Sequence, residues 1–524
     1  MKMYWLFIQL NIFIRVFWLA VNLAPAMGFV TGLCYLVALT LVGVYALFKV
    51  KFRYWKKRGI PHFEPRIPYG TLFRNGNKEQ HITENLTEIY EAFKGKTPFA
   101  GAYFFTQALP IAVDLDFIQY VLVKDFKLFN DRGIYYNPKY DPLSLNMFNV
   151  KGNHWKRLRT KLTPTFTSGK MKFMYPTIVE VATRFDQTLS EAVRMGSVIE
   201  IKELLARFTT DVIGTCAFGI ECNSLKDPNA EFRRMGRKFF AEPPLRTFGR
   251  TLVNQFPKLS IELGIKTTST EVSSFFMGIV KETLEYREKN NIRRDDFMDL
   301  LIQLKRSSTA DNEFSVVDVA AQAFLFFLAG FETSSTTMTF ALYELALDTE
   351  IQDKARNEIN EVLKKHNGKF TYEAMMDMKY LDCIINETLR KHPPVVVLMR
   401  VAEEDYPVPG TDKIVEKGQR IFIPAYSIHH DPDIYPNPEV FDPSRFEPEE
   451  IKKRHPMSFL GFGDGPRNCI GARFGQMQTR IGLVTLLRSY RFTPCNKTLI
   501  PMKYSRVFVL SPEGGMYLNV EKIN

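Results

Sequence analysis

The sequence predicts a mainly α protein with a minor β part, joined to a membrane-spanning helix near its N-terminus. Two observations carry this prediction. Several long segments place apolar residues at the helical period, and one early segment carries no charge over 22 residues. The chain has 524 residues, of which 45% are hydrophobic and 24% are charged. Such fractions are typical of globular proteins and exclude a wholly disordered chain or a collagen.

The charge-free segment runs over residues 27–48 and is long enough to span a bilayer, which takes about 20 apolar residues. Six basic residues follow directly, between Lys49 and Arg58. Such a cluster stays on the cytosolic side, so we expect a transmembrane anchor with a cytosolic body. A cleaved signal peptide is the alternative, but its apolar core would be only about 7–15 residues long and small residues would follow it.

Residues 1–26 are apolar but include Asn11 and Arg15. An arginine at the centre of a membrane costs roughly 3 kcal/mol to insert. We therefore interpret residues 1–26 as a gene-model extension, with Met27 as the true start, rather than as an extra membrane-associated segment. Residues 49–68 read as a basic and proline-rich linker, and residues 69–524 as one continuous domain.

The formal net charge of +12 belongs mostly to the N-terminal segment. Residues 1–60 contain eight basic residues and no acidic one, which leaves a net charge of only +4 for the rest of the chain. This distribution argues against a nucleic-acid-binding domain. The six cysteines include no Cys-x-x-Cys pair, which excludes a zinc ribbon or a thioredoxin motif, and their sparse spacing suits a reducing compartment.

Helical periodicity dominates the body of the chain, whereas the strand signals are short. The last third, from Pro393 on, is rich in proline, glycine and turn dipeptides. The segments predicted as helices are 82–93, 274–289, 350–366 and 378–392, and those predicted as strands are 102–105, 111–115, 420–424, 506–510 and 516–520.

Residues 314–347 form a long apolar segment without proline. A second membrane span is possible by length, but Asp318, Gln322, Glu332 and Glu344 interrupt it, so we predict a buried core helix. A glutamate among phenylalanines is costly to bury unless it has a partner or a role in the chemistry.

The segment 459–475 reads FLGFGDGPRNCIGARFG and allows three interpretations. A dinucleotide fingerprint requires a preceding strand, which is absent from the local pattern. A glycine-rich turn with an inert buried cysteine is the second interpretation. The third is a thiolate ligand loop, in which glycines let the backbone approach a flat cofactor and point amide groups at one sulfur. Arg467 and a helix starting near Ile470 would add positive charge there.

Phe462-x-x-Gly465-x-Arg467-x-Cys469-x-Gly471 resembles the haem-binding signature of the cytochrome P450 family at every fixed position. The resemblance implies the cytochrome P450 fold, a single large haem domain that binds haem b. It further implies that Cys469 is the axial iron ligand as a thiolate, that Phe462 packs near it and that Arg467 meets a haem propionate.

Other motifs of the family follow in its order. Trp155-x-x-x-Arg159 and Arg400 correspond to propionate-binding positions. Ala329-Gly330-x-Glu332-Thr333 is similar to the oxygen-binding segment, in which the glycine leaves room for O₂, Thr333 supplies a hydrogen bond and Glu332 relays protons.

Glu387, Arg390 and Arg445 resemble the family's Glu–Arg–Arg triad. We assign these three residues a role in folding and in supporting the haem loop. The segments YWKKRGIPH and HWKRLRTKLTPTFTSGKMK look like insect microsomal enzymes of cytochrome P450 family 6. The resemblance covers the chain from about residue 27 to its end.

The resemblance implies a monooxygenase of the endoplasmic reticulum membrane that faces the cytosol. It would insert one oxygen atom of O₂ into lipophilic substrates, such as plant toxins, insecticides or endogenous lipids and hormones. Electrons would come from NADPH only indirectly, through NADPH–cytochrome P450 reductase, with cytochrome b5 assisting in the family. Candidate docking residues for the reductase are Lys156, Arg157, Lys452, Lys453 and Arg454.

The family's substrate-contacting segments correspond to residues 130–149, 239–256, 395–398 and 507–510, which are mostly apolar or aromatic here. Two other functions stay open at this point. One is a haem-thiolate isomerase or dehydratase that uses peroxides without a reductase, against which the Glu332–Thr333 pair argues. The other is a non-catalytic membrane haem protein that senses a small ligand.

Overall fold

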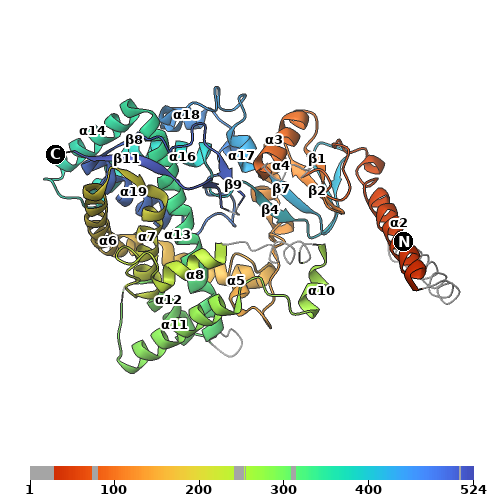
Figure 1. The fold of residues 1–524 in the computed structure, drawn as a ribbon, viewed down its shortest axis with the longest axis horizontal. Helices are drawn as coiled ribbons and strands as arrows, with labels where there is room; N and C mark the ends of the chain where they lie inside the picture. The colour runs from red at the N-terminus through yellow and green to blue at the C-terminus, as the bar shows by residue number, and fades with distance from the viewer. Residues whose placement is uncertain are drawn as a thin grey trace. The chain divides into compact units, whose positions relative to one another are not determined.

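The computed structural model describes residues 29–72, 81–240, 253, 255–294, 296–308, 314–506 and 509–523. The predictions for residues 1–26 lie outside this part of the chain, as do those for 241–252, 254, 507 and 508. The chain divides into two compact units between Ile111 and Ala112, which falls inside the segment 69–524 that the sequence predicts as one domain. Each unit is described by itself (Figure 1).

The first unit contains a long apolar helix, a short amphipathic helix and two neighbouring strands. The amphipathic helix coincides with the predicted range and starts with a capping box between His81 and Glu84. The elements are α2 (Phe29–Lys51), η2 (Lys56–Arg58), α3 (Ile82–Phe93), β1 (Phe99–Phe104) and β2 (Gln107–Ala112).

Helix α2 exposes apolar side chains along its length, such as Leu33, Leu41 and Val42. The helical stretch Thr31–Arg58 has a mean hydropathy of 2.1 and is long enough to cross a membrane. Lys49 and Lys51 close α2, so basic residues lie at its C-terminal end. These features are consistent with membrane anchoring.

The basic segment after α2 is partly packed against the first unit. Trp55 is fully buried, and its indole N–H donates to the carbonyl of Ala102 at 2.9 Å. A Cβ at Gly101 would lie 2.4 Å from the Trp55 ring, so the close approach requires glycine there. The linker therefore begins with a fixed contact rather than as a free extended chain.

The second unit is mostly helical, and its longest helix, α13, runs through its middle between α7, α11, α16 and α19 (Figure 1). The helices of this unit are α4 (Leu115–Gln119), α5 (Gly152–Leu162), α6 (Ser168–Met195), α7 (Ile201–Ile213), α8 (Glu231–Phe240), α10 (Pro257–Glu262), α11 (Thr270–Lys289), α12 (Phe297–Arg306), α13 (Val316–Leu347), α14 (Thr349–Lys365), α15 (Tyr372–Asp377), α16 (Lys379–Lys391), α17 (Ala425–His429), α18 (Pro448–Lys452) and α19 (Ala472–Ser489).

Helix α13 is the core helix that the sequence predicts. It starts with a capping box, in which Ser315 and Asp318 exchange hydrogen bonds. Its C-terminal half, from Ser334 to Ala346, is buried throughout. Length and composition alone would allow it to span a membrane, but half of its most apolar window is buried inside the protein, as expected for a core helix.

The strands of the second unit are short and antiparallel where their register is defined. β11 pairs with both β3 and β8, and β4 pairs with β7 so that Arg400 lies opposite Ile421. The prediction of a strand over 506–510 is wrong for the residues of this segment that the structure describes. Short strands lie on either side of it, and Val509 and Leu510 belong to neither of them. The strands are β3 (Val198–Glu200), β4 (Leu398–Val401), β5 (Tyr406–Pro407), β6 (Ile414–Val415), β7 (Arg420–Ile423), β8 (Tyr490–Pro494), β9 (Tyr504–Ser505), β10 (Ser511–Pro512) and β11 (Tyr517–Lys522).

A buried ion-pair cluster links α16 to the chain that leads into the loop 459–471, which carries Cys469 and which we call the cysteine loop. Both oxygens of the fully buried Glu387 bind Arg390, at 2.7 and 2.8 Å, and Arg445 lies 3.5 Å from the same carboxylate. Arg390 also donates to the carbonyl of His429 at 2.8 Å. The three charged residues thus come together as the sequence predicts, and breaking such a buried pair costs about 3–5 kcal/mol.

His429 connects this cluster to the start of the cysteine loop. Its Nε2 atom accepts the backbone N–H of Leu460 at 2.8 Å, and its Nδ1 atom lies 3.2 Å from the carbonyl of Arg390. Nε2 must therefore be unprotonated, with the proton on Nδ1. Burial lowers the pKa of His429 to about 3, with the nearby Arg390 charge acting in the same direction.

We expect His429→Gln to flatten the acid dependence of stability. Histidine in the unfolded chain takes up a proton below pH 6.5, whereas folded His429 stays neutral down to about pH 3. The unfolded state then binds more protons, so stability present above pH 6.5 is lost as the pH falls toward 3. This one proton contributes a slope of up to about 1.4 kcal/mol per pH unit. Glutamine accepts from Leu460 without titrating.

The measurement is the urea midpoint as a function of pH for both proteins. His430, whose pKa burial also lowers to about 3, is present in both, so the difference between the curves isolates His429. Parallel curves below pH 6.5 would show that His429 titrates normally in the folded protein.

Candidate active site

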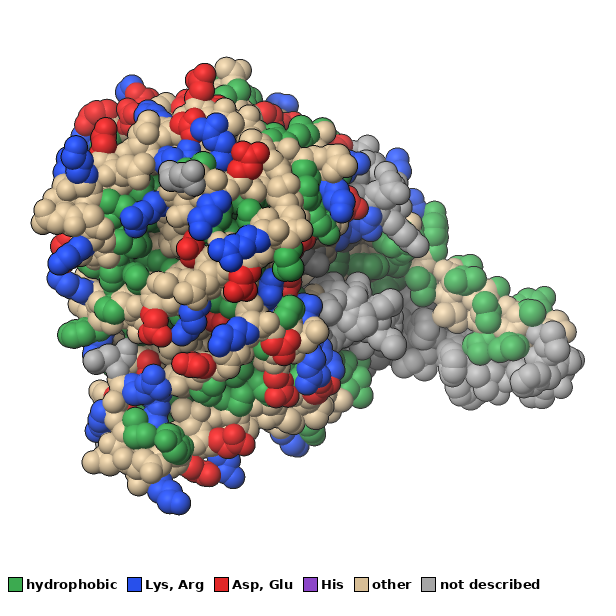
Figure 2. All heavy atoms as spheres, turned by 60° about the vertical axis from the view of Figure 1, so that its left-hand side comes forward, with side chains coloured by type: hydrophobic (Ala, Val, Ile, Leu, Met, Phe, Trp, Pro, Cys, Tyr) green, Lys and Arg blue, Asp and Glu red, His purple; other side chains and the backbone are tan. Residues whose placement is uncertain are grey.

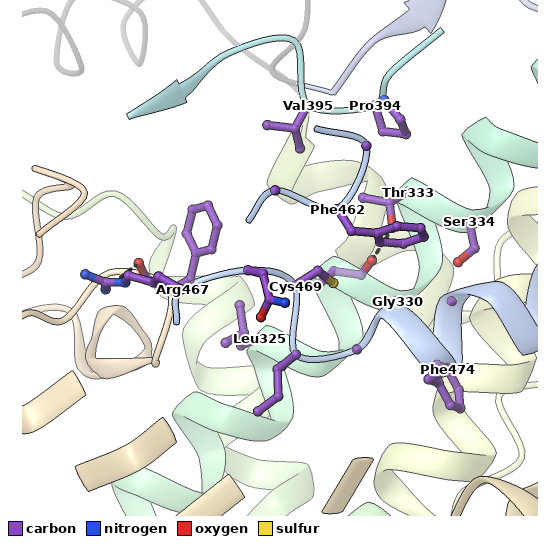
Figure 3. A pocket seen from close by; sticks show the side chains of 18 of the residues that line it. Leu325, Gly330, Thr333, Ser334, Pro394, Val395, Phe462, Arg467, Cys469 and Phe474 are labelled. Atoms are coloured by element: carbon purple, nitrogen blue, oxygen red, sulfur yellow. Dashed lines mark hydrogen bonds between the residues drawn. The ribbon is translucent and has the colours of Figure 1, made fainter. Parts of the chain in front are cut away.

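A cavity of about 280 Å³ lies in the second unit between α13, the segment that leads into β4 and the loop before α19 (Figure 3). Its walls are mostly apolar, and one cysteine and several arginines contribute polar groups. The residues labelled in Figure 3 that line it are Leu325, Gly330, Thr333, Ser334, Pro394, Val395, Phe462, Arg467, Cys469 and Phe474.

Backbone geometry holds the cysteine loop in place. The N–H of Cys469 donates to the carbonyl of Phe462 at 2.9 Å, which closes the loop on itself. Gly465 has φ = 72°, and a Cβ there would lie 1.8 Å from the carbonyl oxygen of Leu122, so only glycine fits. Helix α19 begins at Ala472, two residues later than the sequence predicts.

Cys469 is accessible and lines the cavity, with its sulfur toward α13 (Figure 3). Desolvation by the surrounding protein raises the pKa of the Cys469 thiol. The N–H of Gly471 and the charges of Arg159 and Arg132 act in the opposite direction. Arg467 extends away from Cys469 on the other side of the loop (Figure 3). The positive charges that act on the sulfur are therefore Arg159 and Arg132, and not Arg467 as expected from the sequence.

Three arginines, Arg132, Arg400 and Arg467, form a cluster at one end of the cavity, which we call the arginine cluster. All three line the cavity, and Arg400 and Arg467 are each 2% exposed. Within the described residues, their hydrogen bonds go to backbone carbonyls: Arg132 donates to Phe148 at 3.1 Å and Arg400 to Met399 at 2.8 Å.

Burial and mutual repulsion act on the arginine cluster. Burial lowers the pKa of Arg400 to about 10 and that of Arg467 to about 9, where the charge of Arg400 adds to the effect and Asp131 partly offsets it. The Nε atoms of Arg400 and Arg467 are buried and have no hydrogen-bond partner among the residues that the structure describes. Concentrated, incompletely satisfied positive charge beside a cavity fits an anionic group such as a carboxylate pair.

Arg132 is the cluster member that the sequence analysis did not identify as a site residue. It lies inside the segment 130–149, which was assigned to substrate contacts. Its side chain donates to the carbonyl of Arg467 at 2.9 Å, so it contacts the cysteine loop directly. The residues are far apart in the chain, and no local pattern links them.

Helix α5 places Trp155 and Arg159 one turn apart, and both line the cavity. The guanidinium of Arg467 lies 4.9 Å from the centre of the Trp155 ring. Arg159 binds the main-chain and side-chain oxygens of Asn468, at 2.9 and 2.7 Å. It is thus attached to the residue before Cys469, in addition to lying beside the cavity.

The oxygen-binding segment of α13 divides between two faces. Thr333 lines the cavity, and its hydroxyl donates to the carbonyl of Ala329 at 2.7 Å. Glu332 is not among the described residues that line it: its carboxylate lies 2.7 Å from Nζ of Lys202 in α7. The partly buried glutamate thus has a charged partner, and no sequence signal connects Lys202 with it.

Gly330 also lines the cavity, but its missing side chain faces α7. A Cβ there would lie 2.7 Å from Cδ1 of Ile213. A larger residue at this position would therefore require the Ile213 side chain, which also lines the cavity, to shift.

Two of the four predicted substrate segments contribute to the cavity wall. Met147 and Phe148 come from the segment 130–149, and Val395 and Leu398 from 395–398. Much of the other two segments lies outside the described residues.

Comparison with known proteins identifies the family. The cytochrome P450 family model matches residues 61–519. The chain is 48% identical to "Probable cytochrome P450 6a21" of Drosophila melanogaster over 495 residues, which cover 93% of this chain and 98% of the relative. It is 46% identical to "Cytochrome P450 6A1" of Musca domestica, over 93% and 98% of the two chains. The chain therefore belongs to the cytochrome P450 family, whose members hold haem iron through a cysteine thiolate, and it is a haem monooxygenase.

Proposed function

We propose that this protein is a microsomal monooxygenase of lipophilic molecules in which Cys469 is the axial haem ligand. The observation that carries the proposal is the cavity, which places one accessible thiol and the arginine cluster on a mostly apolar surface. A flat, dianionic macrocycle with a metal centre fits this combination. The thiol would meet the metal, the arginines the two carboxylates and the apolar walls the rings.

The arginine cluster would hold the haem propionates, with Trp155 packed beneath Arg467. Phe462 accepts the N–H of Cys469 through its own carbonyl and so fixes the ligand's backbone. The bound haem supplies the activation of O₂, from which one oxygen atom enters the substrate and the other leaves as water. The protein contributes orientation, exclusion of water and protons.

Protons would arrive through the hydroxyl of Thr333, which already faces the cavity. Glu332 is held by Lys202 on the neighbouring helix, so we assign it to proton supply behind Thr333 rather than to contact with the reacting atoms. Lys202 also lies 3.4 Å from the hydroxyl of Thr336, so the pair connects to a second hydroxyl on α13.

The substrate class follows from the apolar side chains that line the cavity. Leu325, Ala329, Val395 and Leu398 offer apolar surface. Apolar walls with few polar groups favour lipophilic molecules, such as plant toxins, insecticides and endogenous lipids or hormones.

Electrons would come from NADPH through NADPH–cytochrome P450 reductase, with cytochrome b5 as a further donor. Lys156 and Arg157 are exposed on α5, the helix that also carries Trp155 and Arg159. Of the other candidates, Lys452 and Lys453 pair with Glu449 and Glu450 of the same helix, and Arg454 stacks on the Tyr435 and Phe446 rings. Basic and acidic side chains are likewise intermixed on the face in Figure 2. Lys156 and Arg157 are therefore the favoured docking residues.

The N-terminal helix would anchor the protein in the endoplasmic reticulum membrane, with the haem domain in the cytosol. The exposed apolar surface of α2 and the lysines at its C-terminal end support this orientation. We propose residues 27–48 as the anchor, 49–68 as the linker and 69–524 as the haem domain.

Cys469→Ser should abolish thiolate ligation of the haem. Reduced wild-type protein with carbon monoxide should show a Soret band far to the red of that of a histidine-ligated haem, because the thiolate donates charge to iron. The variant should lack this band. Cys495→Ser, which changes a half-buried cysteine away from the cavity, is the control and should keep it. A red-shifted band in Cys469→Ser would contradict the assignment.

Thr333→Ala should uncouple NADPH oxidation from product formation, because the proton is no longer delivered from a hydroxyl in the cavity. We expect the product formed per NADPH to fall by about tenfold or more. Thr333→Ser keeps the hydroxyl and should restore most of the coupling. The measurement is NADPH consumed, hydrogen peroxide released and product formed in the same reaction. Fully coupled turnover in Thr333→Ala would refute the proton relay.

Lys156→Ala combined with Arg157→Ala should slow haem reduction by the reductase several-fold at low salt, because exposed charges steer association. Haem content should not change. Lys452→Ala with Lys453→Ala removes two lysines that acidic neighbours already neutralise, so its reduction rate should stay close to that of wild type. Equal rates for the two double variants in stopped-flow reduction would refute the proposed docking residues.

A further inference from the structure

Gln322 lies in α13 eleven residues before Thr333, is fully buried and binds a segment of backbone from outside the helix. Its Oε1 atom accepts the N–H of Met147 at 2.9 Å, and its Nε2 atom donates to the carbonyl of Leu145 at 3.2 Å. A primary amide offers a donor and an acceptor side by side, so it can pair with a backbone strand as a neighbouring strand would. The pairing fixes residues 145–147 in register on α13.

The segment that Gln322 holds is ordered further by its own polar side chains. Asn146 accepts the N–H groups of Phe148 and Asn149 at 3.1 and 3.2 Å and donates to the carbonyl of Leu143 at 2.9 Å. Residues 143–149 thus form a turn whose carbonyl directions are set by side chains. The orientation of this turn relative to α13 depends on Gln322.

The carbonyls that follow the turn bind the arginine cluster. Arg132 donates to Phe148, and Arg467 donates to Val150 and, at 3.5 Å, to Met147 and Phe148. These two cavity-lining arginines are therefore held by a frame of carbonyl oxygens. A shift of the segment moves the acceptors and with them both guanidinium groups.

We propose that Gln322 is a positioning residue for haem binding, which sets Arg132 and Arg467 through the segment 145–150. The inference rests on the proposed function, because it takes the arginine cluster as the site of the haem propionates. Gln322 and Thr333 lie about three turns apart on one helix. Helix α13 therefore positions both the proton-donating hydroxyl and the arginines at the haem edge.

The same segment forms part of the substrate wall. Met147 and Phe148 line the cavity, and the Phe148 ring lies 4.4 Å from the guanidinium carbon of Arg132. A substrate that displaces Phe148 therefore acts on an arginine that Gln322 helps to position. Substrate fit and haem retention share one structural element.

A second buried glutamine supplies a matched control. Gln352 in α14 is also fully buried, donates to the carbonyls of Leu345 and Phe492 at 2.8 and 2.9 Å and accepts the N–H of Phe492 at 2.9 Å. It is not among the described residues that line the cavity, and it binds β8 instead of the segment 145–150. Replacing either glutamine leaves buried backbone groups unpaired, and Gln352 in addition accepts from the guanidinium of Arg356 at 3.1 Å, so its loss should disturb the fold at least as much.

The test uses the full-length holoprotein and measures the rate of haem transfer to excess apomyoglobin, together with the urea midpoint. Gln322→Leu should release haem about tenfold faster than wild type, the scale expected for a residue that orients a cofactor's direct partners. Gln352→Leu should lower the urea midpoint at least as much as Gln322→Leu does and release haem at close to the wild-type rate. Equal haem release from the two variants would overturn the inference.

A double-variant cycle tests the route through the arginines. In an Arg132→Met background, Gln322→Leu should accelerate haem release less than it does in wild type, because one of its targets is gone. Fully additive effects would overturn the route. If Gln322→Leu yields no holoprotein, Gln322→Met and Gln352→Met carry the same comparison, because methionine replaces the amide at both sites with an unbranched side chain of similar length. A wild-type protein without the thiolate band would refute the proposed function itself, whereas a normal band with equal release rates refutes only the role of Gln322.

Discussion

The concentration of buried positive charge at one end of the cavity is the constraint on which the site depends. Desolvating a guanidinium costs several kcal/mol unless hydrogen bonds and an opposite charge compensate it. The protein supplies carbonyl oxygens for Arg132, Arg400 and Arg467 but leaves two buried Nε atoms unsatisfied. In the function proposed above, the two haem propionates would supply the missing compensation, which would link the stability of this region to haem binding.

Holding arginines by carbonyls rather than by carboxylates leaves their charge available, as the proposed binding of haem propionates requires. A carboxylate partner would form a closed ion pair and leave little attraction for a propionate, whereas a carbonyl fixes direction without neutralising the group. The cost is that the carbonyls themselves need a rigid frame. The segment 145–150 and the loop around Asn130 provide it, and α13 supports the former through Gln322.

The sequence was most informative where one local signal decides the structure. Helix α3 coincides with its predicted range because its amphipathic period and its capping residues indicate the same boundaries. The cysteine loop was predictable from the spacing of its glycines, and Gly465 is a position where only glycine fits. Relations between distant segments were not predictable. Arg132 joins the arginine cluster, and Lys202 pairs with Glu332, through contacts that depend on how loops and helices pack, and neither residue has a distinctive neighbour pattern.

Glu332 illustrates why residue type alone could not settle the site. A motif places it beside Thr333, yet consecutive positions on a helix point about 100° apart, so the motif alone does not decide which of the two faces the cavity. Thr333 takes the cavity face, and Glu332 turns to α7, where Lys202 compensates its burial. Gly330 lies where α13 meets Ile213 of the same helix α7, so one helix pair places both the partner of Glu332 and the close contact at Gly330. Helix packing, more than the motif, therefore decides which groups of α13 reach the chemistry.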